Sequence, residues 1–280
     1  MENFFQITEN ELVLPGVKGK HVFLHISDVH VACVDEFSTE AEKAEMEKAE
    51  AVWDRQRVDF ARNFGEPVYP CHMIPSAQVL HKLFAYAKEN RPERLLLSGD
   101  ILDYLHPAGL RLLEKELGDY GDEYLFVPGN HEGGYEENPA LRAFNGGESG
   151  VRVYEGEGFR IAALDDHKKT VTDNDLAVIR ELSGGKIPVI LLMHVPITTK
   201  ENAEEMKRFG DYFAITEASE DENARELVKT LTDPVSAVKA ILAGHVHGYH
   251  VSTYSCGRKQ IMASSGLVGF IHRFIIRGEH

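Results

Sequence analysis

The chain has 280 residues, 43% of them hydrophobic, which is enough for a sizeable core in one large domain or two small ones. Its net charge of −15 repels polyanions and no Lys/Arg cluster offsets it, so nucleic acid is disfavoured as a partner. The three cysteines are far apart and form no Cys-x-x-Cys pair, which argues against a zinc ribbon or a disulfide framework: Cys33, Cys71 and Cys256.

The termini and the hydropathy predict a cytoplasmic protein without a membrane partner. Residues 1–5 lack the basic and apolar regions of a signal peptide. No apolar stretch is long enough to span a bilayer. The sequence leaves the oligomeric state open.

The first third of the chain predicts a lead-in, one strand and two helices. Residues 1–20 read as a short lead-in that closes at Pro15-Gly16, and residues 21–27 follow as a strand. Residues 38–62 predict a long helix that is rich in Glu and Lys, with a thin apolar stripe that includes Trp53. This composition favours a solvated helix over a lid. A second helix is expected over residues 77–89.

The rest of the chain alternates short apolar strands with helices. Strands are expected over 95–97, 125–127, 159–164 and 189–192, and helices over 110–117 and 173–182, the latter capped by Asp173. Residues 198–234 are polar and acidic with two helical pieces, and residues 249–276 predict short antiparallel strands. Because no linker stands out, we expect one domain over residues 1–280, with helical insertions near 38–90 and 198–234.

Five short segments of the chain carry the residue types that bind metal ions. Each follows an apolar run that predicts a buried strand. In α/β sheets, ligands bind outside the carboxyl ends of the strands, so we expect these segments to converge on one site. They are Asp28-Val29-His30, Gly99 to Asp103, Gly129 to Glu132, Met193-His194 and Gly244 to His247.

The spacing within these segments suits shared cations. Asp28 and His30 are two residues apart, and in an extended segment such residues point to the same side. The pair His245 and His247 repeats this spacing. Asp100 follows a glycine, which leaves room for close approach, and its carboxylate is able to bridge two ions.

Three residues near the expected ligands have other predicted roles. His131 must point away from its neighbour Asn130, whose carbonyl oxygen is a neutral metal ligand, so His131 is expected to face a substrate. Asp103 lies about one helical turn after Asp100 and is expected to orient the imidazole of His131. Glu132 is expected to hydrogen-bond to a neighbouring loop rather than to take part in the reaction.

The charge of the expected site suits a phosphate ester. Two divalent ions bring four positive charges, against two negative charges from Asp28 and Asp100 and one from a bound hydroxide. Oxygen and imidazole ligands without thiolate fit Mn, Fe, Zn or Ni. Two such ions about 3.5–4 Å apart clamp the attacking and leaving oxygens of a phosphate and activate a water.

The five segments, in this order, resemble the signature of the calcineurin-like metallophosphoesterase family: D-x-H, G-D-x-x-D, G-N-H-E/D, H and G-H-x-H. The resemblance implies an α/β fold, a four-layer αββα sandwich of two mixed β-sheets flanked by helices. It also implies two divalent or trivalent metal ions. One would take Asp28, His30, Asp100 and His247, and the other Asp100, Asn130, His194 and His245.

The resemblance further implies a reaction, the hydrolysis of a phosphate mono- or diester by a metal-bound hydroxide. His131 would stabilise the transition state or protonate the leaving oxygen, with support from Asp103. We expect a small-molecule phosphate ester as substrate, and the motifs do not choose between monoesters, cyclic nucleotides, other diesters and phosphoproteins. Two alternatives are a nuclease, disfavoured by the acidic charge, and a non-catalytic metal-binding scaffold, disfavoured because every motif residue is present.

Overall fold

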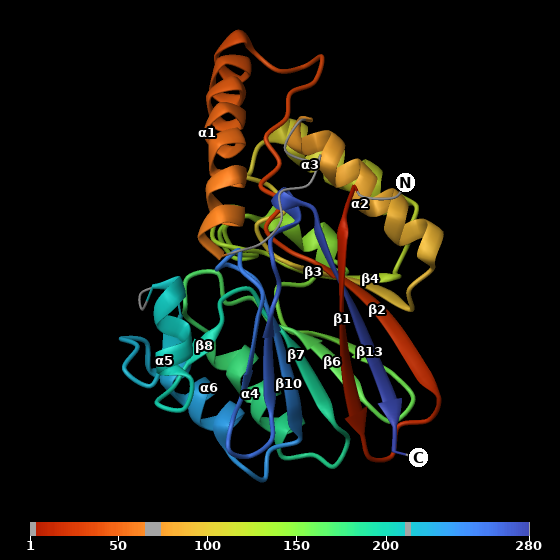
Figure 1. The fold of residues 1–280 in the computed structure, drawn as a ribbon, viewed down its shortest axis with the longest axis vertical. Helices are drawn as coiled ribbons and strands as arrows, with labels where there is room; N and C mark the ends of the chain where they lie inside the picture. The colour runs from red at the N-terminus through yellow and green to blue at the C-terminus, as the bar shows by residue number, and fades with distance from the viewer. Residues whose placement is uncertain (1–3, 65–73, 211–213, 280) are drawn as a thin grey trace.

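Two mixed β-sheets lie face to face at the centre of the protein. The computed structural model describes residues 4–64, 74–210 and 214–279 (Figure 1). Cys71 and part of the predicted insertion near 38–90 lie outside these residues, as does part of the segment 198–234. Cys33 and Cys256 carry free thiols.

The first sheet has five strands in the order β1-β13-β2-β3-β4. Strands β2, β3 and β4 run parallel, whereas β13 is antiparallel to β2 and parallel to β1. The carboxyl ends of β2, β3 and β4 therefore meet at one edge of this sheet. The strands are β1 (Gln6–Leu14), β13 (Phe270–Gly278), β2 (Lys20–Ile26), β3 (Arg94–Ser98) and β4 (Tyr124–Val127).

The second sheet has six strands in the order β11-β12-β10-β7-β6-β5. Its four central strands are parallel, and its edge strands β11 and β5 are antiparallel to their neighbours. A further pair, β8 (Ile197–Thr198) and β9 (Ile215–Thr216), is parallel. The six strands are β11 (His250–Thr253), β12 (Lys259–Met262), β10 (Val238–Ala243), β7 (Val189–Leu192), β6 (Arg160–Ala163) and β5 (Arg152–Glu155).

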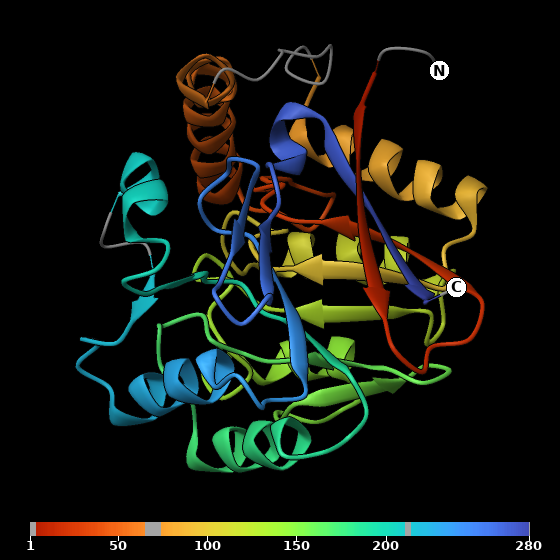
Figure 2. The same ribbon diagram turned by 60° about the horizontal axis from the view of Figure 1, so that its bottom comes forward.

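Helices cover the outer face of each sheet, and Figure 2 shows the two helix layers on opposite sides. Apolar residues of both sheets, among them Phe23, Phe159 and Phe274, form the core between them. Helices α2 (Ser76–Asn90) and α3 (Pro107–Gly118) pack on the first sheet, and α4 (Asp173–Ser183) and α6 (Glu222–Thr232) pack on the second. The four layers confirm the αββα fold class.

The remaining helices lie outside these layers. Helix α1 (Glu40–Phe64) stands beside the first helix layer and projects beyond it (Figure 1). The described helices include none that is long and apolar enough to cross a bilayer. The division of the chain into one domain with two insertions stays a prediction. The short helices are α5 (Ala203–Met206) and the 3-10 helices η2 (Pro139–Asn145), η3 (Lys207–Phe209) and η4 (Gly266–Val268).

The prediction of a lead-in over residues 1–20 is wrong, because β1 is a strand of nine residues. It pairs with β13 along its whole length, from Gln6 opposite Phe270 to Leu14 opposite Gly278. Its buried positions alternate with exposed ones as in a strand with one covered face. One inward position is the polar Asn10, which obscures this alternation in the sequence.

The expected cap of α4 is also one residue off, since Thr172 Oγ1 accepts from the backbone N–H of Asp175 at 3.1 Å.

Two buried histidines face each other where β2 and β13 pair, His25 opposite His272. His272 Nε2 accepts from the Ser264 backbone N–H at 2.8 Å, and His25 Nε2 lies 2.6 Å from Ser98 Oγ. Burial, together with the neighbouring His272, lowers the pKa of His25 to about 3, and burial lowers the pKa of His272 to about 4. Both rings are therefore neutral at pH 5 in the folded chain.

These histidines make the protein less stable as the pH falls below 6.5, the ordinary pKa of histidine, because the unfolded chain then binds more protons. His272→Gln keeps an acceptor for the Ser264 N–H but does not titrate. The unfolding free energy of both proteins should fall between pH 7 and pH 5. The fall should be smaller in His272→Gln than in the wild type, by about 2 kcal/mol. Urea titrations at both pH values measure this difference, and identical losses in the two proteins would contradict it.

Candidate metal centre

The seven expected ligands gather where five strands end. Each lies two to four residues beyond the carboxyl end of β2, β3, β4, β7 or β10, as the sequence predicts. They form two groups of ligand atoms that meet at one carboxylate. The seven are Asp28, His30, Asp100, Asn130, His194, His245 and His247.

The first group consists of Asp28, His30 and His247, whose ligand atoms all lie within 4.8 Å of one another. His30 Nε2 lies 3.0 Å from His247 Nε2, which in turn lies 3.4 Å from Asp28 Oδ1. Burial, together with the neighbouring His30, lowers the pKa of His247, so its ring stays neutral and keeps a lone pair for a cation.

The second group surrounds the Nε2 atom of His194. Asn130 Oδ1 and His245 Nδ1 both lie 3.1 Å from this nitrogen, and Asp100 Oδ2 lies 3.3 Å from it. Asp100 Oδ2 is also 3.8 Å from His30 Nε2, so this buried carboxylate lies between the two groups. Its position suits the predicted bridge.

The proton on His194 shows why a cation fits this group. His194 Nδ1 lies 2.7 Å from the carbonyl oxygen of Ser98, which only accepts, so Nδ1 carries the proton. In the neutral ring, Nε2 then carries a lone pair that faces two acceptor oxygens, of Asn130 and Asp100, and the Nδ1 atom of His245. Burial opposes a second proton, but the Asp100 carboxylate outweighs it and raises the pKa of His194 to about 10. The same negative field favours metal ions, and ligand sets of imidazole and oxygen suit them.

The backbone at the ligands is left-handed, which corrects the expected geometry. Asp28 and His30 do not converge through the alternation of an extended strand, because both have left β2 and have positive φ angles. Conformations of this kind cost on the order of 1–3 kcal/mol each and cluster at functional sites. Five ligands share this feature, with φ between 49° and 69°: Asp28, His30, Asp100, His245 and His247.

Hydrogen bonds hold this strained backbone. They join the loops that carry the five motifs, which we call the motif loops. The N–H groups of Asp28 and His30 donate to the carbonyl oxygens of Gly99 and Asp100, at 3.0 and 2.9 Å. The Asp28 carboxylate accepts from the backbone N–H of His245 at 3.0 Å. The first, second and fifth motifs are therefore joined directly.

Close packing explains the glycines that precede two of the ligands. A Cβ atom on Gly129 would overlap Asp100 Oδ1. A Cβ atom on Gly244 would overlap Ser27 Oγ and lie 2.6 Å from Asp28 Oδ2. Any larger residue at these positions would displace a carboxylate of the site.

Two buried carboxylates outside the ligand set fix the motif loops. Glu132 accepts from the backbone N–H groups of Asp100, Leu102 and Gly129 at 2.7 to 2.8 Å, which confirms its expected loop contact. Asp166 accepts from the N–H groups of His194 and Val195, at 2.8 and 2.9 Å. The sequence analysis assigned Asp166 no role, since nothing local in the sequence indicates this contact.

His131 is partly exposed at the edge of the centre, and its expected role toward a substrate stays a prediction. Its Nδ1 atom is 2.7 Å from the carbonyl oxygen of Asp103 and 3.1 Å from Asp103 Oδ1, and its side chain is 34% exposed. Burial opposes protonation, but the hydrogen bond to Asp103 and the charge of Asp100 outweigh it and raise the pKa of His131 to about 9. Asp103 therefore orients this ring with Nε2 left for other contacts.

Helix α1 also reaches the centre, which the sequence analysis did not foresee. The indole of Trp53 is buried and stacks on the ring of His30, with 4.0 Å between ring centroids. The prediction of a merely solvated helix is therefore wrong at Trp53. Only the apolar character of this residue among charged neighbours marked it in the sequence.

Comparison with known families agrees with this geometry. The family model described as calcineurin-like phosphoesterase matches residues 21–249. The chain belongs to the calcineurin-like phosphoesterase family. This calcineurin-like chain is therefore a metal-dependent phosphoesterase, and the family range spans all five motifs.

Solved structures of other proteins are similar to this phosphoesterase. A dimetal phosphatase from Danio rerio aligns over 88% of each chain, with a TM-score of 0.55 and 14% sequence identity. A phosphopantetheinyl hydrolase from Mycobacterium tuberculosis aligns over 90% of this chain and 92% of that chain, with a TM-score of 0.46 and 12% identity. No curated protein matches the sequence. The first likeness supports the fold assignment.

The carboxylate of Glu132 should be essential for the stability of the motif loops. Glu132→Gln replaces one acceptor oxygen by an NH₂ group that faces a backbone donor, which should lower the unfolding free energy by about 1–3 kcal/mol. Chemical denaturation in the presence of a chelator measures the effect without bound metal. Glu136→Gln is the matched control, because Glu136 is 67% exposed and pairs only with Arg142 among the ion pairs described. Equal stability of the two variants would contradict the role of Glu132.

Proposed function

We propose that this phosphoesterase hydrolyses a small phosphate mono- or diester at a binuclear centre formed by the seven gathered residues. The observation that carries the proposal is the position of Asp100 Oδ2, 3.3 Å from His194 Nε2 and 3.8 Å from His30 Nε2. One cation would be held by Asp28, His30, Asp100 and His247, and the other by Asp100, Asn130, His194 and His245. The ligand types suit Mn, Fe, Zn or Ni.

The charge of the site supports a phosphate ester as substrate. Two cations held by Asp28 and Asp100 would leave a positive pocket in a chain of net charge −15. When bound, such a pair polarises the phosphoryl group and lowers the pKa of a water molecule. A small ester reaches this pocket against less repulsion than a nucleic acid would meet from the acidic surface.

His131 is the group that we assign to the leaving oxygen. Asp103 occupies the Nδ1 side of the ring with both its backbone carbonyl and its carboxylate, so a proton for transfer resides on Nε2. In the chain without metal ions, burial opposes protonation of this ring, but the hydrogen bond to Asp103 and the charge of Asp100 raise its pKa to about 9. The backbone N–H of His131 also donates to Asp100 Oδ1 at 2.9 Å, which ties the acid to the bridging carboxylate.

A substrate panel tests the proposed reaction. We expect the protein to turn over p-nitrophenyl phosphate, bis-p-nitrophenyl phosphate or a cyclic nucleotide when Mn²⁺ is added, with two metal ions per chain by mass spectrometry. The panel also separates monoester from diester preference. Absence of turnover on every ester, with two ions bound, would overturn the proposal and favour a binding role. The cytoplasmic location stays a prediction.

His131→Ala should lower kcat by about 10²–10⁴-fold, because it removes the proposed acid and no expected metal ligand. The measurement is steady-state turnover of the preferred ester, together with the metal content of the same sample. Loss of a metal ion from this variant would show that His131 holds the centre together. A rate equal to that of the wild type would contradict its role in the reaction.

A further inference from the structure

The single tryptophan of the chain contacts the proposed metal centre from helix α1. Trp53 is 8% exposed, and its ring lies 4.0 Å from the ring of His30 at an angle of 26°. The same indole lies 5.9 Å from the ring of His247 and 6.0 Å from that of His131. His30 and His247 belong to the same proposed cation, and His131 is the proposed acid.

Asp103 contacts two of these histidines as well as the indole. Its Oδ1 atom lies 3.5 Å from His30 Nδ1 and 3.1 Å from His131 Nδ1. Burial raises the pKa of Asp103, but hydrogen bonds from His131, His30 and the Trp53 indole outweigh it and hold the pKa well below its usual range. Trp53 thus contacts His30 through its ring face and Asp103 through its N–H group.

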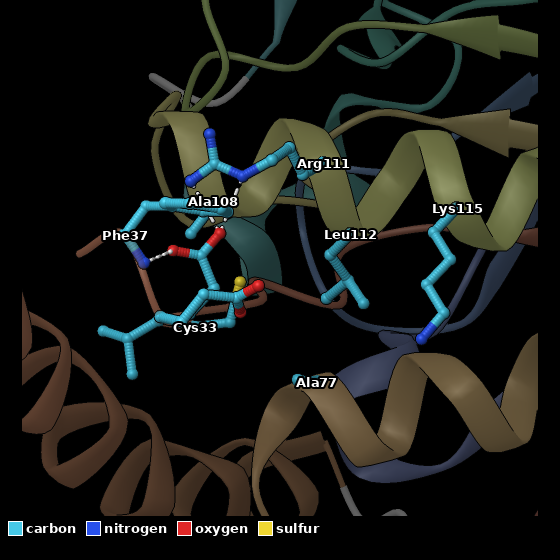
Figure 3. Close-up of a pocket in the computed structure, with 10 residues that line it drawn as sticks. Cys33, Phe37, Ala77, Ala108, Arg111, Leu112 and Lys115 are labelled. Atoms are coloured by element: carbon cyan, nitrogen blue, oxygen red, sulfur yellow. Dashed lines mark hydrogen bonds and ion pairs between the residues drawn. The ribbon is translucent and has the colours of Figure 1, made fainter.

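The segment that joins His30 to helix α1 is held against α3. Asp35 in this segment accepts from Arg111 of α3 at 2.6 Å, and the Arg111 guanidinium lies over the ring of Phe37. These residues line a cavity of about 380 Å³ between α2 and α3, shown in Figure 3. Thr39 and Glu42 then form a capping box at the start of α1, with Glu42 N donating to Thr39 Oγ1 at 3.2 Å.

Further contacts fix the same helix nearer to the indole. Glu50 of α1 accepts from the backbone N–H of Ser76 at 2.9 Å, and Ser76 Oγ accepts from the backbone N–H of Ala32 at 2.9 Å. Ala32 lies two residues after His30. The hydroxyl of Tyr104 donates to Met46 Sδ at 3.2 Å. The helix is therefore anchored on both sides of the loop that carries His30.

We infer that Trp53 is a positioning residue, which holds the His30 ring and Asp103 so that one of the two cation positions binds more tightly than it would without the indole. The inference rests on the proposed function, because it takes His30 as a ligand. Outer groups that orient a metal-binding histidine typically contribute 10–100-fold to metal affinity. Loss of the indole should weaken the cation position formed by Asp28, His30, Asp100 and His247. The second cation position should keep its affinity.

Titration of the metal-free protein with Mn²⁺ alone tests this inference. The wild type should bind two ions, and in Trp53→Ala one of the two should bind about 10–100-fold more weakly while the other keeps its affinity. Trp53→Phe keeps a stacking ring and lacks only the N–H group, so its affinity for Mn²⁺ should fall less than that of Trp53→Ala. Two unchanged affinities in Trp53→Ala would overturn the inference.

Met46→Ala is the matched control for general damage to the helix. Met46 is buried on α1, as Trp53 is, and its described contact is with Tyr104 rather than with an expected ligand. This variant should bind both ions as the wild type does. If Met46→Ala weakened one position as much as Trp53→Ala, the indole would have no special role and the inference would fail.

The fluorescence of Trp53 separates failure of this inference from failure of the proposed function. Because the chain has one tryptophan and its ring lies on His30, binding of paramagnetic Mn²⁺ at this position should quench the emission of the wild type. Two bound ions with unquenched emission would overturn the placement of Trp53. A chain that binds none of Mn²⁺, Fe²⁺, Zn²⁺ and Ni²⁺ would overturn the proposed metal centre itself.

Discussion

Crowding of lone pairs around His194 and His30 is the interaction on which this end of the molecule depends. Imidazole nitrogens approach one another to 3.0 and 3.1 Å, and a buried carboxylate lies between them. In a buried place two lone pairs at this distance repel one another unless a proton or a cation lies between them. The left-handed backbone at five ligands adds strain to this repulsion. Both costs are offset by hydrogen bonds in the loops and, in our proposal, by two cations.

The groups that offset these costs come from distant parts of the chain. Glu132 and Asp166 each tie two or three backbone N–H groups of the motif loops, and neither lies among the expected ligands. The C-terminal part contributes as well, since the hydroxyl of Ser265 donates to the carbonyl oxygen of Asp28. The metal centre is therefore the meeting point of loops that are already held by the protein, which is the pre-organisation that catalysis needs.

The residues that gather at the site could be predicted from the sequence, because they belong to short motifs that directly follow apolar strands. The parallel order of β2, β3 and β4 then brings three motifs to one edge by topology alone. Contacts between distant residues left no local signal. Asp166 binds a backbone 28 residues away, β1 pairs with a strand more than 250 residues later, and Trp53 reaches His30 from a helix whose charged composition indicates a solvated surface. The route by which Asp28 and His30 converge was also not apparent, because Asp and His adopt left-handed φ angles more often than most residues, but the sequence does not mark which of them do so.

The pairing of β13 with both β1 and β2 has a consequence for how the molecule forms. During synthesis, β2 exposes an unpaired edge until residues 270–278 have left the ribosome, and β1 has no strand to join before then. Contacts of such high sequence separation form slowly and leave intermediates with open edges. A nascent chain that already carries all five motifs therefore still lacks the strand that closes its first sheet. Completion of the sheet that carries three of the motifs is in this way delayed until residues 270–278 have been made.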